Sequence, residues 1–315
     1  MRVAITGAGG RLGRALLAAL GEAPFTGPYG PLAWSRPDYD LDDPSAAARS
    51  VGRDRPEVVI HAAAWTDVDG CACEPARAMR RNALAVAELA DACAAAGTDL
   101  VLVSTNEVFD GRRADGRGYT PEDRPAPVNP YGASKLAGET AAQATFLRRG
   151  GVFDTADAAP PPGPQLAIVR TAWLFGPPGN DFPARIIAAA ERSRAGGEPL
   201  RVVGDEIGSP TYAPDLADAI VELLAAGAFA GLHHVVNGGA VSRAAWARQV
   251  LAAARLDIPV TEVPLATWAR PSTAPAWAVL APTALPSGEP LRPWEAAFAD
   301  YLPLLLRGRV PAARS

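Results

Sequence analysis

The stretch Arg2-Val3-Ala4-Ile5-Thr6-Gly7-Ala8-Gly9-Gly10-Arg11-Leu12-Gly13 decides the fold. Its first five residues form a short apolar run closed by glycine, which is typical of a buried strand. Apolar residues then recur with helical period up to residue 20. The early glycines allow a tight turn and a close backbone approach, and Gly13 lets the helix pack closely on the sheet. A helix N-terminus also attracts phosphate. We therefore predict a strand–turn–helix unit that binds a dinucleotide, against the alternative of an ordinary glycine-rich turn.

Strands and helices alternate along the rest of the chain. Further strands are expected at residues 31–34, 58–62, 100–104 and 166–170, and helices at 44–53, 76–96, 131–149, 182–194, 214–226 and 242–254. This alternation predicts an α/β fold with a doubly wound parallel sheet of the Rossmann type. The proline-rich last 50 residues predict loops and short elements, suited to a smaller substrate-binding lobe.

We expect the chain to divide into two discontinuous domains. The dinucleotide-binding domain would comprise residues 1–170 plus about 214–254. The substrate-binding lobe would comprise about 171–213 plus 255–315. Residues 148–164 contain two adjacent glycines and the run Pro160-Pro161-Pro162-Gly163-Pro164, and they predict a surface insertion.

Composition excludes several classes of partner. The 315 residues carry a net charge of −4 and no basic tract, which argues against nucleic acid. No apolar run reaches the roughly 20 residues that span a bilayer. The first strand starts at Arg2, so we expect no signal peptide. Three cysteines without a disulfide framework indicate the cytoplasm, and we expect no metal site. We expect a monomer or a homodimer.

The end of the second strand bears on the choice of cofactor. An acidic residue there usually holds the ribose hydroxyls of NAD. Here the strand ends Trp34-Ser35-Arg36, and serine and arginine suit a 2′-phosphate better. We therefore predict NADPH, with NADH as the alternative if Arg36 is only a solvated surface residue.

Tyr131 and Lys135 form the candidate catalytic pair. Lys135 is the one lysine in the chain, whose other 29 basic residues are arginine. The i, i+4 spacing puts both side chains on one face of a helix. An ammonium beside a phenol lowers the phenol's pKa and favours general acid–base catalysis, and Lys135 can also hold the nicotinamide ribose. Thr105, at the end of the fourth strand, can polarise a substrate carbonyl, although a threonine there is also an ordinary strand-end cap.

Four longer stretches, together with these motifs, resemble the dTDP-4-dehydrorhamnose reductases of the extended short-chain dehydrogenase/reductase superfamily. They are residues 61–69 (HAAAWTDVD), 104–111 (STNEVFDG), 130–139 (PYGASKLAGE) and 170–176 (RTAWLFG), with further matches at 202–216 and 292–294. The resemblance implies NADPH-dependent reduction at C4 of a nucleotide-linked 4-keto-6-deoxy sugar. Tyr131 would protonate the alkoxide and Thr105 would bind the keto oxygen.

The resemblance also assigns residues to the two ligands. It implies that the cofactor contacts Gly7, Gly10, Arg11, Leu12, Gly13, Ala62, Ala63, Ala64 and Lys135. Asn82 would belong to a wider catalytic network. Trp173 would lie near the substrate nucleotide, with a core tryptophan as the alternative.

One departure concerns the substrate. The usual Asp-Tyr pair of the fourth-strand motif is replaced by Asn106 and Glu107, side chains that the resemblance places toward the sugar. The identity of the sugar therefore stays open. Two other functions stay open as well. One is an NADP-binding regulatory subunit resembling the beta subunit of methionine adenosyltransferase, whose motif also carries asparagine at this point. The other is another extended short-chain dehydrogenase, such as a nucleotide-sugar epimerase.

Overall fold

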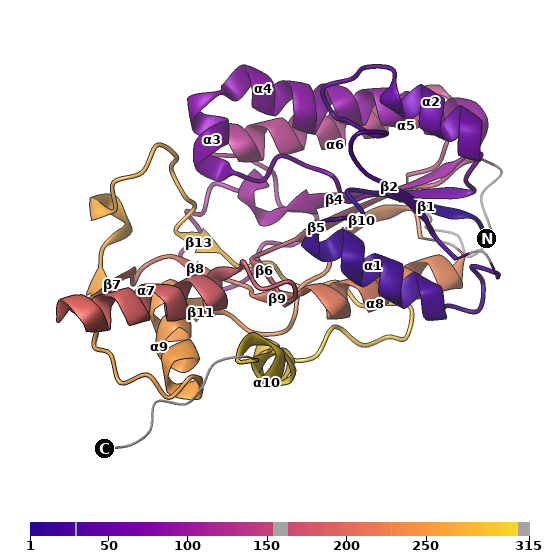
Figure 1. Cartoon of the computed structure of the whole chain (residues 1–315). Helices are drawn as coiled ribbons and strands as arrows, with labels where there is room; N and C mark the ends of the chain where they lie inside the picture. The colour runs from indigo at the N-terminus through magenta and orange to yellow at the C-terminus, as the bar shows by residue number, and fades with distance from the viewer. Residues whose placement is uncertain (29, 154–162, 228, 308–315) are drawn as a thin grey trace.

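A parallel sheet of six strands is the framework of the larger lobe (Figure 1). The computed structural model describes residues 1–28, 30–153, 163–227 and 229–307. The strand order is β10-β5-β4-β3-β1-β2, and all neighbours pair in parallel. The strands are β1 (Val3–Thr6), β2 (Leu32–Trp34), β3 (Val58–His61), β4 (Asp99–Thr105), β5 (Leu166–Thr171) and β10 (Gly231–His234). Strand order reverses between β1 and β3, which is where such sheets bind ligands.

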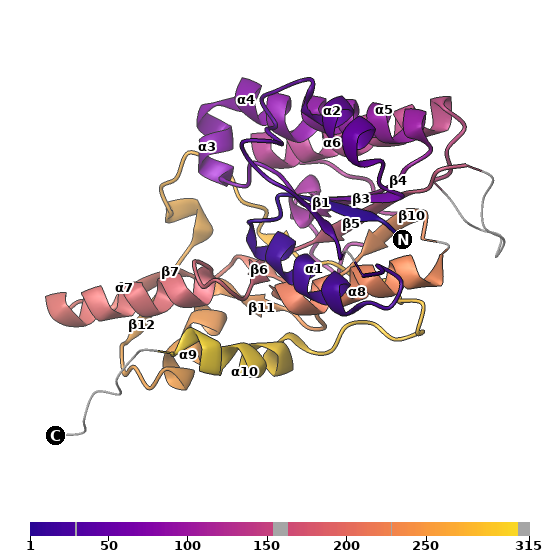
Figure 2. The ribbon, with the colours of Figure 1, turned by 45° about the vertical axis from the view of Figure 1, so that its right-hand side comes forward.

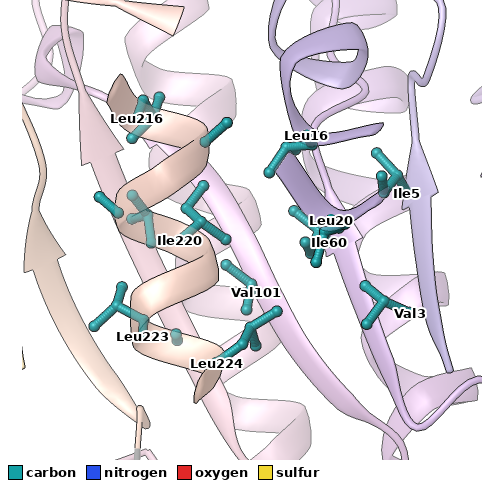
Figure 3. Packing of buried hydrophobic residues seen from close by; sticks show 14 of the residues in the cluster. Val3, Ile5, Leu16, Leu20, Ile60, Val101, Leu216, Ile220, Leu223 and Leu224 are labelled. Carbon is teal, nitrogen blue, oxygen red and sulfur yellow. The ribbon is translucent and has the colours of Figure 1, made fainter. Parts of the chain in front are cut away.

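Helices cover both faces of this sheet, which confirms the doubly wound fold. Helices α1 (Arg11–Glu22) and α8 (Ala213–Ala226) lie on one face, and α2 (Ala46–Asp54), α5 (Ala85–Ala96) and α6 (Pro130–Arg148) lie on the other (Figure 1). Because both faces are covered, strands β1, β3 and β5 are buried at every residue. Figure 3 shows the core between the sheet and helices α1 and α8, where Ile5, Leu16 and Ile220 pack without exposure to solvent.

The expected helix over residues 76–96 is interrupted. It consists of α4 (Pro75–Met79), the π-helical segment η1 (Arg80–Leu84) and α5, and a short helix α3 (Val68–Cys73) precedes it. A hydrophobic period of 3.6 residues does not predict a single wider, π-helical turn of this kind. The wide turn contains Asn82, whose side chain bonds the backbone of Trp65 on both its N–H and C=O and donates to Ser134. The interruption therefore coincides with a buried polar anchor.

The smaller lobe is built from short strands and three helices. The helices are α7 (Phe182–Gly196), α9 (Arg243–Ala253) and α10 (Trp294–Leu305), and they lie close together below the main sheet (Figure 2). The strands are β6 (Leu174–Phe175), β7 (Leu200–Val203), β8 (Ile207–Gly208), β9 (Thr211–Tyr212), β11 (Val241–Ser242), β12 (Val260–Val263) and β13 (Trp277–Ala278). They pair in sheets of two or three strands.

Two expectations for this half of the chain differ from the structure. Helix α9 packs on α7, β7 and β12, so it lies with the smaller lobe although we expected residues up to about 254 in the larger one. Helix α10 lies where only loops and short elements were expected. Its residues Trp294, Ala297, Phe298 and Tyr301 are buried at helical spacing, so packing outweighs the high proline content around it. The division into two domains otherwise stays a prediction.

The predicted surface insertion falls mostly outside the described residues, because these omit 154–162. On its near side α6 ends at Arg148, and Val152 forms a bridge with Gln165 at the start of β5.

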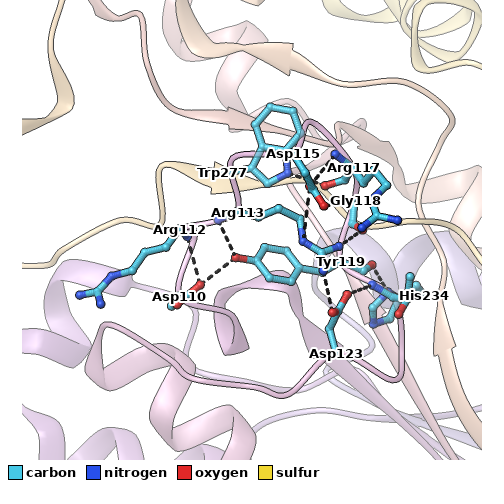
Figure 4. A network of polar contacts seen from close by, with 11 residues as sticks. Asp110, Arg112, Arg113, Asp115, Arg117, Gly118, Tyr119, Asp123, His234 and Trp277 are labelled. Carbon is cyan, nitrogen blue, oxygen red and sulfur yellow. Dashed lines mark hydrogen bonds and ion pairs between the residues drawn. The ribbon is translucent and has the colours of Figure 1, made fainter.

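The segment after β4 returns to the smaller lobe through a polar network around Tyr119 (Figure 4). The Tyr119 hydroxyl donates to Asp110, and Arg113 contacts both Asp123 and the carbonyl of Gly118. The ring of Tyr119 stacks on Phe109 at 4.3 Å between centroids. On the far side the Trp277 indole of β13 donates to Arg117. This network fixes the loop that follows the candidate site residues of β4.

Candidate active site

One cavity of about 920 Å³ lies at the carboxyl ends of β1, β3 and β4, between the two lobes. Doubly wound sheets bind their ligands at this edge. The cavity gathers side chains and backbone from segments far apart in sequence. Its lining includes the residues that we expected to contact the cofactor or the substrate: Gly7, Gly10, Arg11, Leu12, Gly13, Arg36, Ala62, Ala63, Ala64, Thr105, Asn106, Glu107, Tyr131, Lys135 and Trp173.

The glycine turn has the geometry of a phosphate cradle. Gly7 has φ +66°, and a Cβ there would lie 2.9 Å from the backbone of Ala63. A Cβ on Gly13 would lie 2.2 Å from the Gly7 oxygen, so only glycine allows α1 to pack this closely. Gly10 is the N-cap of α1 and supplies no side-chain cap. The first N–H groups of the helix are therefore available to a ligand.

Two arginines border the cofactor end of the cavity in different ways. Arg11 spans the lobes, because its guanidinium donates to the carbonyls of Gly176 and Leu174 and to the Asn180 side chain. Arg36, at the end of β2, is exposed and forms no hydrogen bond or ion pair with any residue in the described ranges. Its guanidinium is therefore free to bind a phosphate at the cavity rim.

Thr105, Tyr131 and Lys135 all line the cavity. The first residue ends β4 and the other two lie one turn apart on α6. The Thr105 side chain hydrogen-bonds the Tyr131 phenol and also accepts from the N–H of Glu107, so it is both a cap and a site residue. Lys135 Nζ donates to the carbonyl of Val103 at 2.8 Å.

The local sequence explains why α6 begins at this point. Asn129 is the N-cap and accepts from the N–H of Gly132, while Pro130 occupies the first turn. A Cβ at Gly132 would lie 2.0 Å from the backbone carbonyl oxygen of Glu107, so glycine lets the helix start close against the end of β4. This close start brings Tyr131 against Thr105.

The expected lowering of the Tyr131 pKa by Lys135 is not what the structure gives. Burial raises the pKa of Tyr131, the nearby Glu107 carboxylate raises it further, and only the hydrogen bond from Thr105 lowers it. The Lys135 ammonium bonds to a backbone carbonyl instead of the phenol. Burial also lowers the pKa of Lys135 from its usual 10.5 to about 8, opposed by the charge of Glu139.

A buried ion pair lies one helical turn beyond Lys135. The carboxylate of Glu139 accepts three bonds from the guanidinium of Arg170, at 2.6, 3.1 and 3.2 Å, and a further bond from the Ser104 hydroxyl. Both charged side chains are about 95% buried. The pair links α6 to β4 and β5 directly behind the catalytic candidates.

Glu107 and Asn106 occupy different environments. Asn106 is buried and donates to the carbonyl of Ala278, so its side chain is tied to the smaller lobe. Oε2 of Glu107 accepts from Asn129 Nδ2 at 2.7 Å. Burial raises the pKa of Glu107, and Glu206 raises it further. The cavity thus contains a desolvated carboxyl group beside the phenol of Tyr131, the candidate general acid.

Trp173 is both a core and a cavity residue. Its indole stacks on Trp246 at 6.1 Å between centroids, and its close contact with Gly208 leaves no room for a Cβ there. The guanidinium of Arg243 lies 3.4 Å from the Trp173 ring centroid and pairs with Glu206. Residue pattern alone did not suggest Arg243, because α9 was assigned to the other domain.

Other expectations are partly met. Asn82 is absent from the cavity lining, and its amide instead holds the backbone of Trp65, which does line the cavity. Arg81 was not anticipated, and it reaches the cavity while paired with Asp42 and placed over the Trp65 ring. Across the described residues, no three histidine, cysteine or acidic side chains gather as a metal site, and no helix is long and apolar enough to cross a membrane.

The sheet, the glycine turn and the paired tyrosine and lysine in one cavity define a short-chain dehydrogenase/reductase of the extended type. The chain belongs to the family of the RmlD substrate binding domain, whose sequence model matches residues 1–306. It is 39% identical to a dTDP-4-dehydrorhamnose reductase of Mycobacterium tuberculosis over 96% of this chain and 92% of that protein.

Two further relatives extend the comparison. A probable dTDP-4,6-dihydroxy-2-methyloxan-3-one 4-ketoreductase of Streptomyces antibioticus is 33% identical over 100% of this chain and 99% of that protein. The crystal structure of a dTDP-4-dehydrorhamnose reductase from Bacillus anthracis in complex with NADP superposes with a TM-score of 0.83. It is 30% identical, and the match covers 96% of this chain and 99% of that one. The family resemblance expected from the sequence is thereby confirmed.

Proposed function

We propose that this protein reduces the C4 keto group of a nucleotide-linked 4-keto-6-deoxy sugar with NADPH. The observation that carries the proposal is the meeting of Thr105, Tyr131 and Lys135 in the cavity that the glycine turn borders. The named activities of the two curated relatives are reductions of dTDP-linked or keto-sugar substrates, which supports the same chemistry here.

The residues at the cofactor end fit a nicotinamide dinucleotide. The uncapped start of α1 and the close approach of Gly7 and Gly13 suit a pyrophosphate. Ala62, Ala63 and Ala64 would line the nicotinamide side, and Ser35 with the free Arg36 would bind a 2′-phosphate. NADP in the Bacillus anthracis relative supports this choice. When bound, the reduced cofactor supplies a hydride to the sugar carbon.

The chain's own groups would handle the proton and the carbonyl. Thr105 would donate its hydroxyl hydrogen to the keto oxygen, and Tyr131 would transfer its phenolic proton to the oxygen as negative charge develops there. A raised pKa keeps the phenol protonated at neutral pH, so the proton is present when the substrate arrives. Lys135 would bind the cofactor ribose from its anchored position on Val103.

The smaller lobe would bind the nucleotide. Trp173 offers an aromatic surface, and Arg243 places a positive charge over it that can meet a phosphate. We also propose a cytoplasmic location and a monomer or homodimer, with no nucleic-acid or membrane partner.

The direct test follows NADPH oxidation with dTDP-4-dehydrorhamnose as substrate. Tyr131→Phe should lose at least about 100-fold in kcat/KM, which is the usual contribution of a general acid. Tyr212→Phe is the matched control, because Tyr212 is also buried but lies in the smaller lobe outside the cavity lining, and it should stay within about twofold.

Three results would contradict the proposal. Tight NADP binding without turnover of any 4-keto sugar would favour the regulatory-subunit reading. NAD that stays bound through purification, with interconversion of sugar epimers, would favour an epimerase. Full activity in Tyr131→Phe would remove the phenol from the mechanism.

A further inference from the structure

We propose that Glu107 selects the sugar, by accepting a hydrogen bond from a donor group on the carbon next to the reacting carbonyl. This inference rests on the reduction proposed above and adds to it the substituent that the substrate must carry. The two curated relatives are named for different sugar substrates, so substrate choice within this family requires a residue that differs from chain to chain.

The carboxyl group of Glu107 is held with one oxygen free. Oε2 accepts from Asn129 Nδ2 at 2.7 Å, and Asn129 is itself fixed because its Nδ2 also donates to the Thr273 carbonyl at 2.8 Å. Oε1 accepts no hydrogen bond from the described residues. It is not among the fully buried polar atoms that lack a partner, and Glu107 lines the cavity. A partly desolvated acceptor without a partner favours a ligand that donates to it.

The charged groups around Glu107 do not form an ion pair with its carboxyl group. Glu206 lies close enough to disfavour its charge, and Arg243 and Arg270 favour it. Those arginines have carboxylates of their own, because Arg243 pairs with Glu206 and Arg270 with Asp69. No ion pair therefore occupies Glu107 within the part of the chain that the structure describes.

The position of Glu107 relative to the reacting atoms indicates which sugar carbon it meets. Its N–H bonds to Thr105, and its carboxylate acts electrostatically on Tyr131, the two residues that would hold the keto oxygen. In a 4-keto-6-deoxy sugar the neighbours of C4 are C3, which carries the variable substituent, and C5, which carries the ring oxygen and the methyl carbon. A hydrogen-bond donor next to the carbonyl is therefore one on C3, either a hydroxyl or a protonated amine.

The experiment compares three dTDP-linked 4-keto-6-deoxy sugars that carry at C3 a hydroxyl, an amine or only hydrogen. For the wild-type protein, kcat/KM should be about 10- to 100-fold higher with a donor than without one, because a substrate without the donor leaves a desolvated acceptor unpaired. The hydroxyl and amine arms then show which donor is preferred. Glu107→Met removes both oxygens at similar size and should reduce the difference between the sugars to about threefold or less, whatever its common effect on all three through Tyr131.

A second variant tests the inference even if Glu107→Met fails to fold. In Glu107→Gln the amide oxygen should pair with Asn129, which turns the NH₂ toward the cavity and replaces an acceptor with a donor. The amine substrate should then lose more than the hydroxyl substrate, while NADPH affinity and the melting temperature stay unchanged. Equal wild-type kcat/KM for all three sugars, or a preference that survives in both variants, would overturn the inference while leaving the reductase intact. No turnover of any of the three would instead overturn the proposed function.

Discussion

The protonation of Lys135 offers a measurement that this chain makes unusually simple. Lysine labelled with ¹³C at Cε gives one protein resonance, because the chain holds a single lysine. Its chemical shift follows the charge on Nζ, so no assignment is required. The perturbation is a rise in pH from 6 to about 11.5 without nucleotide, using an expression tag that lacks lysine.

The expected magnitude follows from burial. Lys135 is only 3% exposed, and desolvation lowers its pKa from 10.5 to about 8. That difference of about 2.5 pH units corresponds to about 3 kcal/mol, at 1.36 kcal/mol per unit. Between pH 8 and 10.5 the unfolded chain holds the proton and the folded chain does not, so stability rises with pH across this window. Below pH 8 both states are protonated and the contribution is constant.

Two readouts check the reasoning. The ¹³Cε resonance of the native protein should titrate near pH 8, and the same resonance in denaturant should titrate near 10.5. The free energy of unfolding of the wild type, compared with Lys135→Met, should rise by about 2–3 kcal/mol from pH 8 to 10. Lys135 is not among the causes of the Tyr131 shift, and the one group whose pKa it lowers, His61, titrates at about 3, far below this pH range. A native midpoint near 10.5 would refute the desolvation argument.

Three further predictions concern the cradle, the ion pair and the cofactor. Gly13→Ala should cost about 1–3 kcal/mol and weaken NADPH binding, whereas Gly9→Ala, whose Cβ meets no atom within 4 Å, should leave the stability unchanged; equal denaturation midpoints for the two variants would contradict this. Glu139→Gln should lower the free energy of unfolding by about 3–5 kcal/mol by leaving the charge of Arg170 unpaired, and adding Arg170→Met should recover part of the loss. Arg36→Ala should raise KM for NADPH about 10-fold and leave KM for NADH unchanged; a parallel rise in both would exclude a 2′-phosphate contact.

Much of the candidate site is local in sequence, and for that reason it could be predicted. The glycine turn could be predicted because three glycines among four residues separate a short apolar run from a helical period. The i, i+4 spacing of Tyr131 and Lys135 puts both on one face of any helix. Thr105 closes an apolar run, so it had to lie at a strand end, and parallel strands bring their carboxyl ends to one edge.

The remaining features depend on contacts between distant segments. Arg243 was missed because no period in the sequence states that α9 packs on α7 instead of on the main sheet. The role of Arg11 as a link between lobes requires the carbonyls of Leu174 and Gly176, about 165 residues away. The wide turn at Asn82 depends on the hydrogen bonds of its side chain to Trp65, and hydrophobic periodicity cannot predict those bonds.

The sequence by itself determined the parallel sheet, the dinucleotide turn and the identity of the catalytic candidates, since backbone sterics and side-chain period act over a few residues. Only the tertiary structure decided the electrostatics of the site. The sequence predicted a phenol with a lowered pKa, because an ammonium stands one turn away. In the folded chain that ammonium points to Val103, and burial together with Glu107 raises the pKa of Tyr131 instead. Desolvation depends on everything packed around a group, and no local pattern contains that information.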